Sequence, residues 1–97
     1  MQIDSFDWDE GNIAKCQKHG VSIMEIEQLF MEPPAPLMMH DVAHSQDEQR
    51  FLAVGQTQAG RYVFIAFTIR EREKKRLLRP ISARYMHDKE VANYERN

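Results

Sequence analysis

Polar and apolar residues follow patterns along the first quarter of the chain that predict a short strand and a helix. Residues 5–8, Ser-Phe-Asp-Trp, alternate polar and apolar, which is typical of a strand. Asp9 is a favourable helix N-cap, and Glu10 suits the positive end of the helix dipole. We expect this helix to run to about His19 and to stop at Gly20, a residue suited to the left-handed position after a helix.

A second helix is predicted by the strongest local signal in the sequence. Residues 22–25, Ser-Ile-Met-Glu, form a capping box, and Val21 with Ile26 can form the hydrophobic staple around it. Proline cannot continue a helix, so residues 32–34, Glu-Pro-Pro, should end it.

Strand patterns dominate the middle of the chain. Residues 37–39 are a weak strand candidate, followed by an acidic loop at 41–47. Residues 50–56 and 61–69 are clear strands joined by a short turn. Residues 62–67 are continuously apolar, as expected for a strand buried on both faces.

The last third of the chain predicts one more strand and a helix. A charged connection at 70–76 leads to a strand at 77–83, where Pro80 indicates an edge position or a bulge. Residues 87–94 are most simply a short helix. The predicted order is β-α-α-β-β-β-β-α, an α+β fold with helices packed on a mainly antiparallel sheet.

Length and composition limit the kind of protein. A chain of 97 residues predicts one domain, 1–97, which buries about 60–70% of its unfolded surface. The lone Cys16 cannot form an internal disulfide, which suits a reducing compartment. No apolar run reaches the roughly 18 residues that span a bilayer. The acidic N-terminus lacks a signal-peptide pattern, so we expect a cytoplasmic protein that does not bind membranes.

The net charge of −2 hides an uneven distribution. Residues 1–49 carry two basic and ten acidic side chains, whereas residues 50–97 carry eleven basic and five acidic ones. This asymmetry indicates a basic face for a polyanion, an acidic face for a basic partner, or both. The two halves neutralising each other across the fold is an equally good interpretation.

The familiar catalytic signatures are missing from the sequence, which has no P-loop, Rossmann glycine motif, HExxH or paired CxxC. His40 and His44 have a spacing that binds metal only on a helix, and their segment is predicted as strand end and loop. We therefore expect no metal and no cofactor. A nucleophilic role for Cys16 is weak, because a small, partly buried side chain explains it better.

Basic side chains are the more informative candidates. Five arginines fall at strand ends or along strands: Arg50, Arg61, Arg70, Arg79 and Arg84. A guanidinium binds phosphate through two hydrogen bonds and stays charged at any cellular pH, so several on one sheet could hold a nucleic-acid backbone. Pairing with the acidic half of the chain is the alternative.

His19 lies near a helix end after Lys15 and Lys18, where it could exchange protons near neutral pH. A histidine there also simply complements the helix dipole. Ser82 and Tyr94 could reach a ribose or a base, although an ordinary sheet hydroxyl and a packed aromatic explain them equally well.

Taken together, these segments resemble the BrnT toxin family, whose members have the RelE-like ribonuclease fold. The resemblance covers nearly the whole chain in order, and each fragment is short. The matching pieces are Phe6-Asp7-Trp8-Asp9, Lys18-His19-Gly20-Val21-Ser22, the helix from Glu25 to Phe30 with Pro33 after it, His44-Ser45, Glu48-x-Arg50-Phe51, Gly55, Gly60-Arg61, Thr68-x-Arg70, Ile81-Ser82-Ala83-Arg84 and Tyr94-Glu95.

The resemblance implies a metal-independent RNA endonuclease, a toxin that inhibits translation. It also implies a cognate ribbon-helix-helix antitoxin that neutralises it, with DNA bound only through the toxin–antitoxin complex. The chain departs from the family pattern at Ile69, where an acidic residue often precedes the arginine, and at Pro80, which interrupts a normally apolar strand.

Within this hypothesis, RNA supplies its own 2′-hydroxyl nucleophile and the protein stabilises charge on the phosphate. We predict Arg50, Arg70 and Arg84 as catalytic phosphate contacts, with His19 or Glu48 as the proton-transfer group. The predicted RNA-binding residues are Lys15, Lys18, Arg61, Arg79 and Ser82.

Two other functions compete with this one. A non-catalytic protein-binding module would use exposed Met38 and Met39 together with the charged surfaces to receive a partner chain. DNA binding without cleavage ranks third, because few helix residues form a basic recognition face.

Overall fold

The computed structural model describes residues 2–96 and has the predicted α+β order. None of the helices in this range combines the length and hydropathy that crossing a bilayer requires. The elements are β1 (Ser5–Phe6), α1 (Glu10–Gln17), α2 (Ile23–Met31), β2 (Leu37–His40), a short 3-10 helix (Val42–His44), β3 (Phe51–Gln56), β4 (Tyr62–Arg72), β5 (Lys75–Tyr85) and α3 (Asp88–Arg96).

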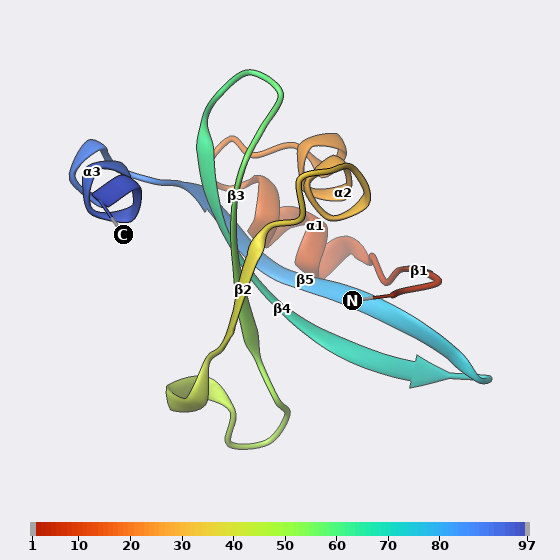
Figure 1. Ribbon diagram of the computed structural model, residues 1–97. Coiled ribbons are helices and arrows are strands. Elements are labelled where there is room, and N and C mark those ends of the chain that lie inside the picture. Colours follow the sequence, from red (N-terminus) through yellow and green to blue (C-terminus); the bar gives the residue numbers. More distant parts are fainter. Residues whose placement is uncertain (1, 97) are drawn as a thin grey trace.

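The strands form one sheet in the order β1-β5-β4-β3-β2. β1 runs parallel to β5, and every other neighbouring pair is antiparallel, as predicted. Figure 1 shows α1 and α2 together on one side, whereas α3 follows the end of β5 apart from them. We call the sheet face that packs on α2 the helix-covered face, and the opposite one the open face.

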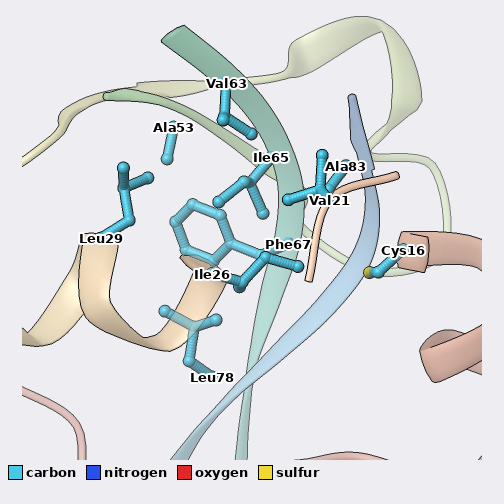
Figure 2. Packing of buried hydrophobic residues seen from close by; sticks show 10 residues of the cluster. All are labelled: Cys16, Val21, Ile26, Leu29, Ala53, Val63, Ile65, Phe67, Leu78 and Ala83. Atoms are coloured by element: carbon cyan, nitrogen blue, oxygen red, sulfur yellow. The ribbon is translucent and has the colours of Figure 1, made fainter. Parts of the chain in front are cut away.

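The core lies between α2 and the helix-covered face. Val63, Ile65 and Phe67 of β4 are almost fully buried there, and Figure 2 shows Ile26 and Leu29 of α2 among them. Successive strand residues point to opposite faces, so the residues between these three face the other way and are only half-buried. The prediction that 62–67 is buried on both faces is therefore wrong.

Local capping explains where the helices begin. Asp9 and Ser22 each accept a hydrogen bond from the backbone of the third helical residue, and the side chains of Asn12 and Glu25 return the bond. Both capping boxes satisfy backbone donors that a helix start leaves free. Gly20 after α1 has φ +90°, the left-handed conformation predicted for it.

The predicted charged connection at 70–76 is wrong. β4 continues to Arg72 and β5 begins at Lys75, so the turn consists of Glu73 and Lys74 alone. Both have positive φ, 52° and 66°, as a two-residue hairpin turn requires. Glycine and asparagine usually mark such turns, and this one has neither, so the sequence carried no signal for it.

Pro80 lies at a β-bulge, which confirms that alternative. Phe67 pairs with Pro80 while the neighbouring Ala66 pairs with Ser82, so Ile81 is an extra residue in β5. β5 is not an edge strand, but β1 covers it only at 77–78. Beyond residue 78, α1 covers this side of β5, where the Asn12 side-chain amide donates to the Pro80 carbonyl oxygen at 2.8 Å.

Gly55 lies where Leu29 of α2 packs directly against the sheet. A Cβ built there would lie 2.7 Å from Leu29 Cδ1 and 2.9 Å from Leu29 Cγ. We expect Gly55→Ala to lower the free energy of unfolding by about 1–3 kcal/mol, as overpacking of a core does. Urea denaturation measures this as a lower midpoint with an unchanged slope.

The control for Gly55→Ala is a double-mutant cycle with Leu29→Ala. That substitution is itself destabilising, but it removes the atoms that the new methyl group meets. In the Leu29→Ala background, Gly55→Ala should therefore cost little. An equal cost in both backgrounds would show that the contact with Leu29 is not the cause.

Candidate anion-binding site

Three neighbouring strands place a row of side chains on the open face. Phe51 pairs with Phe67, so Arg50 lies beside Thr68, which in turn pairs with Arg79. Arg70 follows Thr68 by two residues and points to the same face. Strand pairing thus brings together three of the arginines that the sequence singled out.

These side chains line an open pocket of about 380 Å³. Helix α1 closes its side, held there by the Asn12 amide, which donates to the carbonyl oxygens of Asp7 and Pro80. The pocket therefore collects four cations from four elements or their ends. Its lining residues are Gly11, Asn12, Lys15, Glu48, Arg50, Thr68, Arg70, Arg79 and Ile81.

Two of the four cations are held by carboxylates. Arg70 donates from Nε and Nη2 to Glu48, at 3.1 and 3.4 Å. Arg79 lies with Nη2 2.8 Å from an Asp9 carboxylate oxygen, so Asp9 both caps α1 and binds this arginine. These pairs fix the two guanidinium groups, which are only 34% and 17% exposed.

The other two cations are not neutralised in this way. Within residues 2–96, neither Arg50 nor Lys15 has a carboxylate oxygen within 4.0 Å. Arg50 is half-buried beside the buried hydroxyl of Thr68, which donates to the Gln49 carbonyl oxygen at 2.9 Å. The pocket thus combines two anchored guanidinium groups with two cations available to an incoming anion.

Glu48 is the one carboxylate that lines the pocket. The hydrogen bond from Arg70 lowers the pKa of the Glu48 carboxyl below its ordinary value, against the smaller effect of desolvation. The same hydrogen bond raises the pKa of Arg70. At neutral pH Glu48 is therefore an anion, able to accept a proton but only as a weak base.

Arg84 lies on the open face away from this pocket. It pairs with Phe64, four residues from Thr68, which corresponds to about 13 Å along the strand. It forms two hydrogen bonds with Glu90 of α3, at 2.8 and 2.9 Å, and these lower the pKa of Glu90 to about 2. The structure does not bring Arg84 together with Arg50 and Arg70, and its catalytic role stays a prediction.

The remaining predicted residues are spread over the surface. Arg61 stacks on the ring of Tyr85, 3.4 Å from its centroid, and Tyr85 faces α2 on the other side of the sheet. Lys18 and His19 are exposed at the end of α1 and do not line the pocket. Ser82 is exposed next to the bulge. Their roles in RNA binding or proton transfer also stay predictions.

The other candidates from the sequence are the histidines, the cysteine and two methionines. His44 binds Asp41 at 2.9 Å, and no cluster of three or more metal-ligating side chains occurs within the described residues. Cys16 is fully buried, which raises the pKa of its thiol to about 11 and leaves it protonated. Met38 was expected to be exposed but packs against the core, whereas Met39 is 42% exposed.

A second hollow, of about 410 Å³, lies between the 33–36 segment and the end of β3. It is lined by Glu25, Glu32, three prolines and no lysine or arginine, so it does not suit an anion. The two hollows therefore differ in charge, and the one with Arg50 is the better candidate for binding an anion.

Four of the nine residues that line the pocket are not among the site residues expected from the sequence: Gly11, Asn12, Thr68 and Ile81. Asn12 sits where a Glu or Gln is expected in a capping box, and that departure was the available signal for its second role. Thr68 is a hydroxyl residue directly after the apolar run 62–67 of β4, and its burial follows only from the packing.

One family model matches the chain over residues 8–90, and it is described as "Ribonuclease toxin, BrnT, of type II toxin-antitoxin system". The matched range includes every residue that lines the cationic pocket. No curated protein matches the chain.

The ion pair in the pocket predicts a titration. We expect the carboxyl pKa of Glu48, followed by carbon-13 NMR, to lie below 4.5 and to rise in Arg70→Gln. Because the folded-state pKa is the lower one, the pair stabilises the fold fully above pH 4.5 and loses its effect as pH falls through the folded value. Arg84→Gln is the control and should leave Glu48 unchanged; an equal shift in both variants would contradict a local cause.

Proposed function

This chain belongs to the BrnT family of ribonuclease toxins of type II toxin–antitoxin systems, and we propose that it is a metal-independent endoribonuclease. The observation that carries the proposal is the open pocket in which four cations meet one carboxylate and no other anion lines the walls. The phosphodiester of an RNA strand is an anion, and it can bind to the positive charge that the single carboxylate does not neutralise.

Phosphate binding falls first to the two cations without carboxylate partners. Arg50 offers a planar set of donors to two non-bridging oxygens, and Lys15 adds a point charge from α1. Arg70 and Arg79, already fixed by carboxylates, supply oriented positive charge at little further cost in side-chain entropy.

The nucleophile and the leaving group both belong to the RNA. The 2′-hydroxyl oxygen attacks the phosphorus, the bond to the 5′-oxygen breaks, and a 2′,3′-cyclic phosphate forms. We assign the 2′-hydroxyl proton to Glu48, which lines the pocket, and the leaving 5′-oxygen takes a proton from solvent. His19 is the alternative acceptor, but it lies outside the pocket.

We expect the four cations to contribute most of the rate enhancement of RNA cleavage. A removed electrostatic stabiliser commonly costs about 10²–10³ in rate, and the pocket has four cations. A base as weak as Glu48 contributes at the low end of the 10²–10⁴ range for proton transfer. Charge on the pentavalent phosphate is met by guanidinium groups, which supports cleavage without a metal ion.

Membership of a type II system implies an antitoxin partner. We propose that this partner is a ribbon-helix-helix protein that neutralises the toxin by covering the cationic pocket. DNA would then be bound by the antitoxin in the complex, and cleavage of RNA by the free toxin would inhibit translation. Arg61, Lys18 and Ser82 remain candidate RNA-binding residues outside the pocket, and Arg84 remains a candidate catalytic phosphate contact.

Substitution of the pocket cations tests the nuclease assignment. We expect Arg50→Ala and Arg70→Ala each to reduce cleavage of a short RNA by about 10²–10³, because each removes charge from the phosphate site. Arg84→Ala, measured beside them, decides whether that residue takes part. Cleavage is followed by gel after purification of each variant by the same procedure.

Arg76→Ala is the matched control, because Arg76 is a strand arginine that pairs with Glu71 and points to the helix-covered face. It should cleave like the wild type, and the loss in the pocket variants excludes a contaminating nuclease. Full activity in both Arg50→Ala and Arg70→Ala would refute the pocket as the active site. A protein that never cleaves RNA would point to the binding-module function.

Metal removal gives a separate prediction. Cleavage should persist at an unchanged rate after dialysis against EDTA, because the charges that stabilise the phosphate belong to the protein. A metal-dependent ribonuclease treated in parallel confirms that the chelation is complete. Loss of activity that Mg²⁺ or Mn²⁺ restores would contradict metal independence.

A further inference from the structure

One carboxylate oxygen in this structure is buried without a hydrogen bond. Asp7 is only 14% exposed, and its Oδ2 finds no hydrogen-bond partner in the described part of the chain. Three guanidinium groups nevertheless face that oxygen: Arg79 Nη1 lies at 3.5 Å, Arg70 Nη1 at 3.8 Å and Arg72 Nη2 at 3.9 Å. Such an atom needs an explanation, because buried polar groups are almost always paired.

The donors around Asp7 are divided between two tasks. Arg70 donates from Nε and Nη2 to Glu48, and Arg79 binds Asp9 through Nη2. The remaining Nη1 group of each arginine points toward the same oxygen without bonding to it. Charge attraction to Asp7 therefore holds both guanidinium groups, although their Nη1 atoms form no hydrogen bond with it.

The backbone fixes Asp7 in this place. Its amide donates to the Leu78 carbonyl oxygen at 2.9 Å, and its own carbonyl oxygen accepts from Asn12. Asp7 does not line the cationic pocket, whereas Arg70 and Arg79 do. A carboxylate behind the pocket thus acts on the phosphate site only through these two arginines.

We propose that Asp7 is a positioning residue, an internal counter-ion that fixes the guanidinium groups of Arg70 and Arg79 in the orientation that binds a phosphate. The inference rests on the proposed ribonuclease function. Without the carboxylate, three guanidinium groups that meet within 4 Å of one point would repel one another. Asp7 offsets that repulsion, but it also lowers the positive potential felt by RNA.

These two effects have opposite signs in an experiment with Asp7→Asn, which keeps the shape and removes the charge. RNA should bind more tightly, by about fivefold at low salt, and the gain should shrink as ionic strength rises. The kcat should fall about tenfold, because the donors are no longer aligned. A merely structural role would not tighten binding while slowing the reaction.

Binding is measured with a short RNA that carries 2′-O-methyl groups and cannot be cleaved, and kcat with the unmodified RNA. Asp88→Asn is the matched control: it makes the same change at exposed Asp88, at the start of α3 and outside the pocket. Both constants should stay at wild-type values there. Asp7→Glu, which restores the charge, should recover binding of wild-type strength.

Thermal denaturation shows whether Asp7→Asn folds. If it does not, Asp7→Asn is combined with Arg72→Gln, which removes one cation together with the anion at a side chain that is 61% exposed. This charge-balanced variant should bind RNA like the wild type and keep the low kcat. Unchanged binding and kcat in folded Asp7→Asn, or a wild-type kcat in the double variant, would overturn the inference.

Failure of the ribonuclease function has a different signature. If the wild-type protein leaves RNA intact, that function is wrong, and the binding arm still decides the role of Asp7. Tighter binding in Asp7→Asn than in Asp88→Asn would then support the counter-ion alone. Equal binding by the two variants would show that Asp7 does not act as a counter-ion for these arginines.

Discussion

Strand β4 carries two incompatible surfaces back to back, and the register of its pairing keeps them apart. Val63, Ile65 and Phe67 are buried against α2, while Thr68 and Arg70 build the cationic pocket on the open face. A slip by one residue would turn every side chain to the wrong face, placing guanidinium groups in the core. The bulge at Pro80 also matters, because the extra residue that it places in β5 determines which face of the sheet Arg79 points to.

Local chemistry made much of the fold predictable. The capping boxes at Asp9 and Ser22 and the left-handed Gly20 are local features that the sequence displays directly, although α1 ends at Gln17 and not at the expected His19. The turn at 73–74 was not predictable, because Glu and Lys adopt positive φ there only under the constraint of two long paired strands. Burial of 62–67 on one face depends on which helices cover the sheet, and composition does not record that.

The site was only partly predictable for the same reason. Arginines at strand ends were visible, but their grouping depends on register: Arg50, Arg70 and Arg79 meet, while Arg61 lies on Tyr85 and Arg84 on Glu90. Neutralisation of one half of the chain by the other holds in part, and the basic face for a polyanion stays a prediction. Carboxylates from the acidic half bind Arg70 and Arg79, and the surplus positive charge is left on the pocket.

Helix α3 contributes no buried residue, in contrast to α1 and α2. Its links to the sheet include the Arg84–Glu90 pair, a hydrogen bond of 3.4 Å from the Tyr62 hydroxyl to Glu95, and the contact between the rings of Tyr62 and Tyr94, with centroids 5.4 Å apart. Fraying of this terminal segment therefore exposes little apolar surface and opens none of the core. The cooperative unit of the molecule ends with β5, and an opened α3 would release Arg84 while the rest of the protein stays folded.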